Sequence, residues 1–161
     1  MADTLVSDIM RTQVPRLART DGVAAVAKAI VQSGLPGLPV VDNGVVVGIV
    51  TESDLIERQA DVEAPTSLPF LDAIFRIDAG RKYEDEVRHV LASTAGEIMT
   101  HPVFNIRASA TIEQLATLMV TDHVNPVPVV DENDVLVGIV SRSDLVNFIA
   151  QLEADSDAAV Q

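Results

Sequence analysis

The chain has 161 residues, and its hydrophobic content of 48% is enough to build a core without disulfides. It contains no Cys, which excludes a disulfide framework, a thiolate metal site and a cysteine nucleophile. The net charge of −13 would repel nucleic-acid phosphates and anionic lipids, and the apolar runs are too short to cross a bilayer. We therefore expect a cytoplasmic protein that binds no DNA, RNA or membrane.

The first predicted element is a helix over residues 23–31. Apolar residues recur there at helical spacing, from Val23 to Ile30. Asp21 is placed to cap the start of this helix, and Ser33-Gly34 marks its end.

A β-hairpin follows this helix. Short β-branched runs over residues 38–41 and 45–50 predict two strands, and the Asp42-Asn43-Gly44 sequence between them is a strong hairpin signal. The second run is apolar almost throughout, as expected when both faces of a strand are covered. Another helix is predicted to begin near Ser53-Asp54.

Residues 60–94 form an insertion without a counterpart elsewhere in the chain. Residues 61–67 indicate an exposed loop, and two helical faces follow, over residues 70–75 and 83–91. We expect this insertion to cover an edge of the core. The alternative is that it supplies a contact to a second copy or to an effector.

The elements of the first half recur after the insertion. A helix over residues 111–120, opened by Ser109 or Thr111, precedes two strands over 127–130 and 135–140. A last helix is predicted to begin near Ser143-Asp144. The tail over residues 153–161 is acidic and rich in Ala, and we expect it to be flexible and frayed.

These recurring elements reflect an internal duplication. Gly48-Ile49-Val50-Thr51-Glu52-Ser53-Asp54 returns as Gly138-Ile139-Val140-Ser141-Arg142-Ser143-Asp144. From the Met of Asp8-Ile9-Met10 or Glu97-Ile98-Met99 to the Asp of the Pro-Val-Val-Asp turn there are 32 residues in each copy (42 − 10 and 131 − 99). We therefore predict one α/β domain of two β-α-β-β-α repeats, residues 1–59 and 95–152, packed face to face about a pseudo-two-fold axis.

The repeated unit resembles the CBS domain over residues 6–59 and 95–152. Asp-Ile-Met followed by Thr, the Pro-Val-Val-Asp turn and the Gly-hydrophobic-Val-Thr/Ser-x-Ser-Asp motif carry the resemblance. A tandem pair of this kind resembles a Bateman module. The resemblance implies a homodimer that binds adenosine-containing ligands, such as AMP, ADP, ATP, S-adenosylmethionine or NAD, between the repeats.

The repeated Gly-to-Asp motif is the predicted ligand site. Thr or Ser offers a hydroxyl, Asp offers acceptor oxygens for ribose, and Gly permits the close approach of a chain or ligand. The resemblance implies a nucleotide site formed by Thr100, His101, Val103, Val124, Asn125, Pro126, Ser141, Arg142 and Asp144. It implies a second, weaker site formed by Thr12, Val14, Leu35, Pro36, Thr51 and Asp54. We rank the second motif as the better site because Arg142 can bind phosphate, whereas Glu52 repels it.

Helix capping is the competing interpretation of this motif. Thr or Ser followed three residues later by Asp is also an ordinary helix start. Capping alone would explain either copy by itself, whereas two copies in this fold favour ligand binding.

No catalytic or metal-binding set is predicted. The chain lacks a phosphate-binding P-loop, a nucleophile elbow and an HExxH motif, so we expect no enzyme and no obligatory cofactor. His101 and His123 lie in loops expected to line the cleft between the repeats.

The predicted function is an allosteric sensor of adenosine-containing nucleotides that signals occupancy to an unidentified effector protein. The acidic charge favours AMP or ADP over ATP. The alternative is a structural dimerisation or protein-interaction module with vestigial sites.

Overall fold

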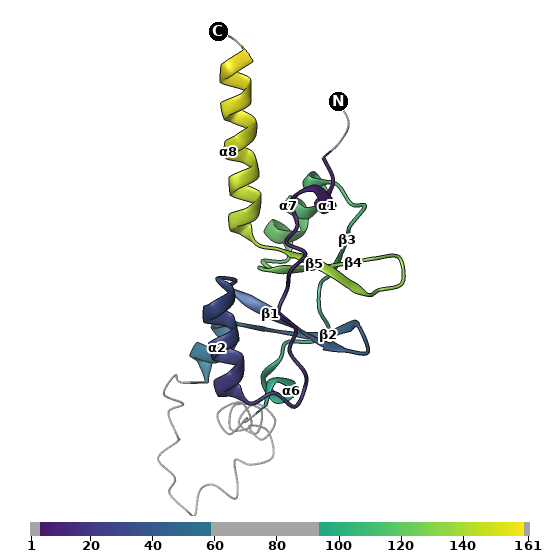
Figure 1. Ribbon diagram of the computed structural model, residues 1–161, viewed down its shortest axis with the longest axis vertical. Coiled ribbons are helices and arrows are strands. Elements are labelled where there is room, and N and C mark those ends of the chain that lie inside the picture. The colour runs from purple at the N-terminus through teal and green to yellow at the C-terminus, as the bar shows by residue number, and fades with distance from the viewer. Residues whose placement is uncertain (1–3, 59–93, 160–161) are drawn as a thin grey trace, which may run out of the picture.

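The computed structural model describes residues 4–58 and 94–159. Its elements are stacked in two units (Figure 1). One unit holds α2, β1, β2, α3 and α6, and the other holds α1, β3, β4, β5, α7 and α8. The predictions for the insertion lie outside the described residues, apart from its last residue. No helix within the described ranges has the length and apolar character needed to span a membrane.

The first long helix is α2, Val23–Ser33. It buries Val26 and Ile30, and it ends at Gly34 in the left-handed conformation, with φ of 66°. The predicted cap at Asp21 is wrong. The side chain of Asp21 accepts a hydrogen bond from the Ala18 amide at 2.8 Å, so it closes the preceding turn, and Gly22 occupies the cap position.

The matching helix in the second repeat is α7, Ile112–Thr121. Thr111 caps it, as predicted, because its hydroxyl accepts from the Gln114 amide at 3.2 Å and the Gln114 side chain accepts from the Thr111 amide at 3.0 Å. Leu115 and Met119 are buried on its inner face.

Both repeats contain the predicted hairpin. In the first, β1 (Gly37–Asp42) pairs antiparallel with β2 (Val45–Thr51). Asn43 and Gly44 have φ of 49° and 83°, so both central residues have the positive φ of a type I′ turn. In the second, β4 (Val127–Val130) pairs with β5 (Leu136–Val140) across a longer turn.

The hairpins join the two repeats. A short strand, β3 (Ile106–Arg107), pairs parallel with β4 and completes a three-stranded sheet. The sheets meet where the amide of Leu136 donates to the carbonyl of Gly44 at 3.0 Å. Val46, Val130 and Leu136 form a buried cluster across this junction, which agrees with the predicted packing through the sheets.

Two short helices pack in the unit of the other repeat. Helix α1 (Val6–Ile9) places Val6 among the buried residues of the second repeat, and its amide donates to the carbonyl of Ala110 at 2.8 Å. Helix α6 (Ala95–Ile98) places Ile98 in the first repeat's core, and the Ala95 amide donates to the carbonyl of Asp21 at 2.8 Å. The repeats therefore exchange their first segments, so each packed unit contains both parts of the chain.

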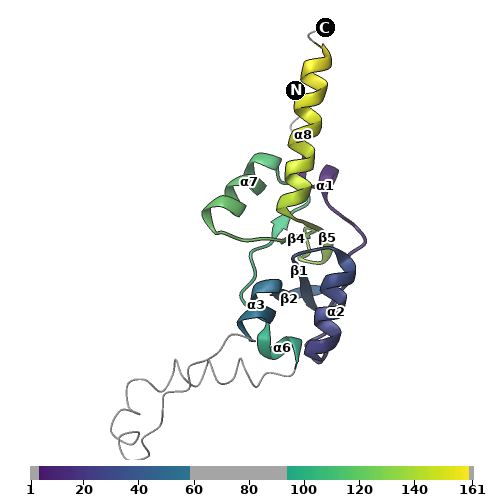
Figure 2. The ribbon, with the colours of Figure 1, turned by 90° about the vertical axis from the view of Figure 1, so that its left-hand side faces the viewer.

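Two helices follow the hairpins. Helix α3 is Glu52–Glu57, and α8 is Arg142–Ala159. The acidic tail expected from residue 153 is helical as far as Ala159, because α8 continues through it. This stretch contains three Ala residues and neither Gly nor Pro, which favours helix. Helix α8 projects beyond the stacked units (Figure 2).

Candidate functional site

The first copy of the motif ends in a carboxylate held by two hydroxyl groups. The Oδ2 atom of Asp54 accepts from the amide of Thr51 at 2.7 Å and from its hydroxyl at 3.0 Å. The Oδ1 atom accepts from the hydroxyl of Thr100 at 3.3 Å. Asp54 is buried, with an exposed fraction of 8%. Capping therefore uses one of its oxygens, and the other faces Thr100 in the second repeat.

The second copy repeats this arrangement with one difference. The Oδ2 atom of Asp144 accepts from the amide and hydroxyl of Ser141, at 2.8 and 2.7 Å. Its Oδ1 atom accepts from Nε of Arg11 at 2.8 Å, in an ion pair. The carboxylate that faces a neutral hydroxyl in the first copy therefore faces a guanidinium group in the second.

The environment of Asp144 also changes its acidity. Burial by itself would raise the pKa of this carboxyl group. The hydrogen bonds from Ser141 and Arg11 and the charge of Arg11 outweigh burial and lower the pKa below its ordinary value. The Asp144 carboxylate is therefore ionised at neutral pH and is committed to these partners.

Equivalent extended segments, at Thr100 and Arg11, lie beside Asp54 and Asp144. Thr100 and Ile49 exchange two backbone hydrogen bonds, of 2.8 and 3.1 Å. Arg11 and Ile139 exchange two of 2.9 and 3.0 Å. Each motif thus lies against the entry segment of the other repeat, and this arrangement follows from the exchange of α1 and α6.

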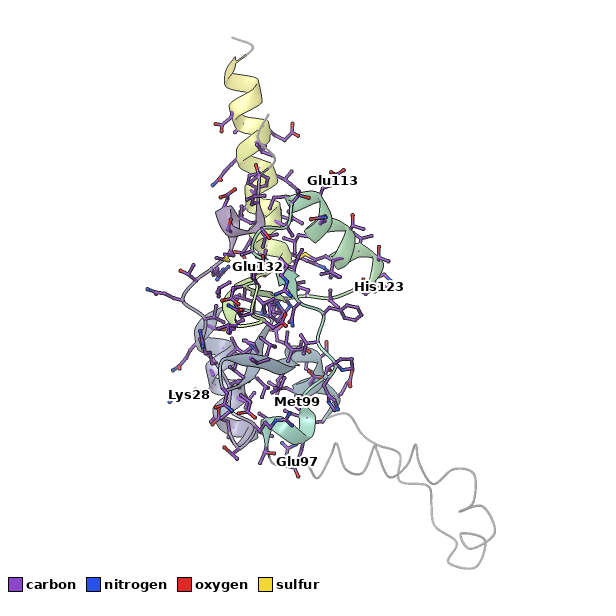
Figure 3. All side chains as sticks on the ribbon, turned by 90° about the vertical axis from the view of Figure 1, so that its right-hand side faces the viewer. Lys28, Glu97, Met99, Glu113, His123 and Glu132 are labelled. Carbon is purple, nitrogen blue, oxygen red and sulfur yellow. The ribbon has the colours of Figure 1, made fainter. Side chains whose placement is uncertain are left out.

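A cleft of about 500 Å³ opens between the repeats beside the first motif. This volume lies within the range of small-molecule sites. Its lining comes from both copies of the motif, from the turn between α2 and β1, from the segment after α6 and from the loop between α7 and β4: Pro36, Ile49, Thr51, Glu52, Ser53, Thr100, Pro102, Val103, Phe104, Asp122, His123, Val124, Asn125, Pro126 and Arg142. Figure 3 shows His123 at the end of α7 that faces this opening.

The cleft combines residues from both predicted sites. From the set assigned to the second motif it contains Thr100, Val103, Val124, Asn125, Pro126 and Arg142, and from the weaker set Pro36 and Thr51. Predicted residues outside its lining are His101, Ser141, Asp144, Thr12, Val14, Leu35 and Asp54. Asp54 lies directly behind the lining, since Thr51 and Thr100 both donate to it. The assignment of these residues to a ligand, and the ranking of the two motifs, stay predictions.

Three of the lining residues that the predicted site sets did not include add an aromatic ring and two carboxylates to the cleft. Phe104 is 51% exposed and offers an aromatic face to the cleft. Glu52 and Asp122 add negative charge. Phe104 follows the Thr-His-Pro-Val run that the resemblance had already pointed to, so its position in the sequence was the available signal.

The charge of the cleft is mixed. Arg142 is the one Lys or Arg among the described lining residues, and Glu52 and Asp122 oppose it. The Arg142 amide donates to the Asn125 side chain at 2.9 Å, which fixes the start of α8 against the loop before β4. Across the described parts of the chain, no group of three or more His, Asp or Glu side chains could hold a metal ion.

The chain matches a known family in both halves. The CBS domain model matches residues 6–61 and 95–151. Protein MJ1426 of Methanocaldococcus jannaschii is 26% identical over 153 residues, which cover 90% of each chain.

Solved structures share the fold. CBSX2 of Arabidopsis thaliana in complex with AMP superposes with a TM-score of 0.74 at 22% identity, covering 93% of this chain and 99% of that one. The CBS domain pair of protein MJ0100, in complex with 5′-methylthioadenosine and S-adenosyl-L-methionine, gives a TM-score of 0.69 at 24% identity, covering 92% and 98%.

Proposed function

The chain belongs to the CBS domain family, and we propose that it binds an adenosine-containing ligand in the cleft between its repeats and signals occupancy to a partner protein. CBS pairs are regulatory ligand-binding modules rather than enzymes. One observation carries the proposal: Thr51 and Thr100 line the cleft and both hold the Asp54 carboxylate behind them. A ribose hydroxyl that displaces the Thr100 hydroxyl would reach Asp54 Oδ1, a strong acceptor.

The remaining parts of an adenosine ligand have partners in the same cleft. The exposed ring of Phe104 provides a stacking surface for adenine. Arg142 provides a guanidinium group for a phosphate. CBSX2 with AMP, and MJ0100 with 5′-methylthioadenosine and S-adenosyl-L-methionine, support this ligand class.

The charge of the cleft supports a ligand with few phosphates. One guanidinium group faces two carboxylates, Glu52 and Asp122, so each added phosphate increases repulsion. We therefore propose AMP or ADP in preference to ATP.

A homodimer is the second part of the proposal. Ile56 of α3 and Val146 of α8 occupy equivalent positions of the two repeats and are 68% and 62% exposed. Ile149, one helical turn after Val146, is 47% exposed. Apolar side chains at matching positions on two helices favour a face that a second copy covers. Light scattering should give the mass of a dimer, and Val146→Glu/Ile149→Glu should shift it toward the monomer.

A thermal-shift screen with AMP, ADP, ATP, NAD and S-adenosylmethionine tests ligand binding. A ligand at about 100 times its Kd should stabilise the protein by about 2.7 kcal/mol. Asp54→Ala should abolish the shift, whereas Asp155→Ala, an exposed site on α8, should retain it. No shift with any ligand would favour the alternative of a structural or protein-interaction module.

A further inference from the structure

Arg11 and Thr100 occupy the same place in the two repeats. Each follows the Met of its repeat, and each exchanges a pair of backbone hydrogen bonds with the strand that leads into the opposite motif, at Ile139 or Ile49. The backbone therefore presents both side chains to equivalent aspartates. The difference between the two motifs lies in the side chain at this one position.

That difference determines which aspartate has an oxygen available. In both motifs the capping hydroxyl and amide occupy Oδ2. Oδ1 of Asp54 is held by a neutral hydroxyl at 3.3 Å, and Oδ1 of Asp144 by a guanidinium Nε at 2.8 Å. The contact at Asp144 is the shorter of the two and is also an ion pair, so Coulomb attraction adds to its hydrogen bond.

We propose that Arg11 closes the second motif to ribose, so that each chain binds one adenosine ligand, at Asp54, which reverses the predicted ranking of the two motifs. This inference rests on the proposed function. A ribose hydroxyl at Asp54 replaces another hydroxyl, so the exchange costs little. At Asp144 it would have to displace a cation and leave the guanidinium without its carboxylate. Arg11 is thus a specificity-determining residue that sets the number of ligands.

The ion pair between Arg11 and Asp144 is partly shielded from solvent and is held in place by the backbone. The Asp144 side chain is 11% exposed and that of Arg11 is 40% exposed, so water and salt screen the pair only partly. The two backbone hydrogen bonds of Arg11 fix the base of its side chain beside Asp144. A ligand would therefore compete with a pair that is already assembled in the free protein.

Isothermal titration of the full chain with AMP tests the stoichiometry. We expect one AMP per chain in the wild type and two in Arg11→Thr, which copies the residue of the first site. Arg11→Met, which keeps an apolar stem but removes the guanidinium, should also bind two. Asp54→Ala should bind none, and Arg11→Thr/Asp54→Ala should bind one.

Lys28→Gln is the matched control for the loss of one positive charge. Lys28 is exposed on α2, and Figure 3 shows it on the side of the molecule opposite His123. This variant should keep one site, and thermal unfolding should show every variant to be folded. Two sites in the wild type, or one site in both folded Arg11 variants, would overturn this inference alone. No binding of AMP by the wild type and all variants would overturn the proposed function for AMP together with this inference.

Discussion

The sulfur of Met10 lies against the main chain of Gly138, so close that a β-carbon on residue 138 would be 2.7 Å from it. Met99 and Gly48 repeat this contact in the first copy, where a β-carbon would be 2.8 Å from Met99 Cγ. The motif's Gly was predicted to admit a chain or a ligand, and in both copies it admits the Met of the exchanged segment. This residue therefore serves the assembly of the two repeats.

Ala substitutions at the two glycines should differ in their cost. Gly138→Ala meets the carbonyl oxygen of Arg11 at 2.9 Å, and that carbonyl accepts a hydrogen bond from Ile139. Because the backbone cannot move without breaking this pairing, we expect a loss of about 1–3 kcal/mol in the free energy of unfolding. Gly48→Ala meets Sδ, Cγ and Cβ of Met99. The two nearest atoms, Sδ and Cγ, move when Met99 adopts another rotamer, and Cβ at 3.0 Å needs only a small shift, so the loss should be smaller.

Urea denaturation of a double-mutant cycle tests this difference. Met99→Ala should relieve much of the cost of Gly48→Ala, whereas Met10→Ala should relieve little of the cost of Gly138→Ala, since the Arg11 carbonyl remains. Equal relief at both sites would contradict the backbone explanation.

Local sequence signals predicted the helices and strands, but they did not predict that the repeats exchange α1 and α6. Asn43-Gly44 identifies its hairpin because only a few residue types adopt positive φ at both central positions. Thr111 and Gln114 likewise identify a helix start without reference to the rest of the chain. Nothing in the residues near Val6 or Ile98 specifies which repeat will bury them, because that choice depends on long-range packing.

The candidate site, too, could be predicted only in part, because its contacts depend on long-range packing. The repeat predicts the motif residues Thr51 and Asp54, but it groups them with the entry segment of their own repeat. The structure places Thr100 on Asp54 and Arg11 on Asp144 instead. A resemblance between repeats gives equivalent positions, and only the fold determines which of them meet.

The low pKa of Asp144 predicts a specific loss of stability in acid. Its folded-state pKa is below its ordinary value, so the unfolded chain binds a proton more readily. The carboxylate's contribution is fully present above the unfolded pKa of about 3.9 and is lost as the pH falls through the folded-state pKa. Asp144→Asn should remove this contribution, so its free energy of unfolding should fall less steeply below pH of about 4 than that of the wild type.

Urea denaturation at a series of pH values measures this slope. Arg11→Met should also flatten it, because one of the groups that lower the Asp144 pKa is removed. Asp155→Asn, at an exposed position on α8, controls for the change in net charge. An unchanged slope in both Asp144→Asn and Arg11→Met would show that the pair has no such role.

Phe104 should contribute to affinity through its ring. It lines the cleft and is half exposed, so its ring is accessible to a ligand. Stacking of a base on an aromatic side chain contributes about 1–3 kcal/mol, so Phe104→Ala should weaken AMP binding by roughly 5-fold to 150-fold. Phe104→Tyr should bind with nearly wild-type affinity because the stacking face is kept. Isothermal titration distinguishes these results, and an unchanged Kd in Phe104→Ala would place adenine elsewhere.

Glu52 and Arg142 should act in opposite directions on phosphate. They occupy equivalent positions of the two repeats, and both line the cleft. Glu52→Gln removes a repulsion, so it should tighten binding by about twofold to fivefold for AMP and by more for ATP. Arg142→Gln should weaken AMP by a similar factor.

Adenosine provides the control for this pair, because it has no phosphate for either residue to attract or repel. Its Kd should be the same in the wild type and in both variants, and the effects on AMP and ATP should diminish as salt is raised from 0.05 to about 0.5 M. A change in adenosine affinity equal to that for AMP would mean that these residues act on the shape of the cleft and not on the ligand's charge. The cleft would then discriminate among adenosine ligands by contacts to the base and ribose, and the preference for AMP or ADP over ATP would lose its electrostatic basis.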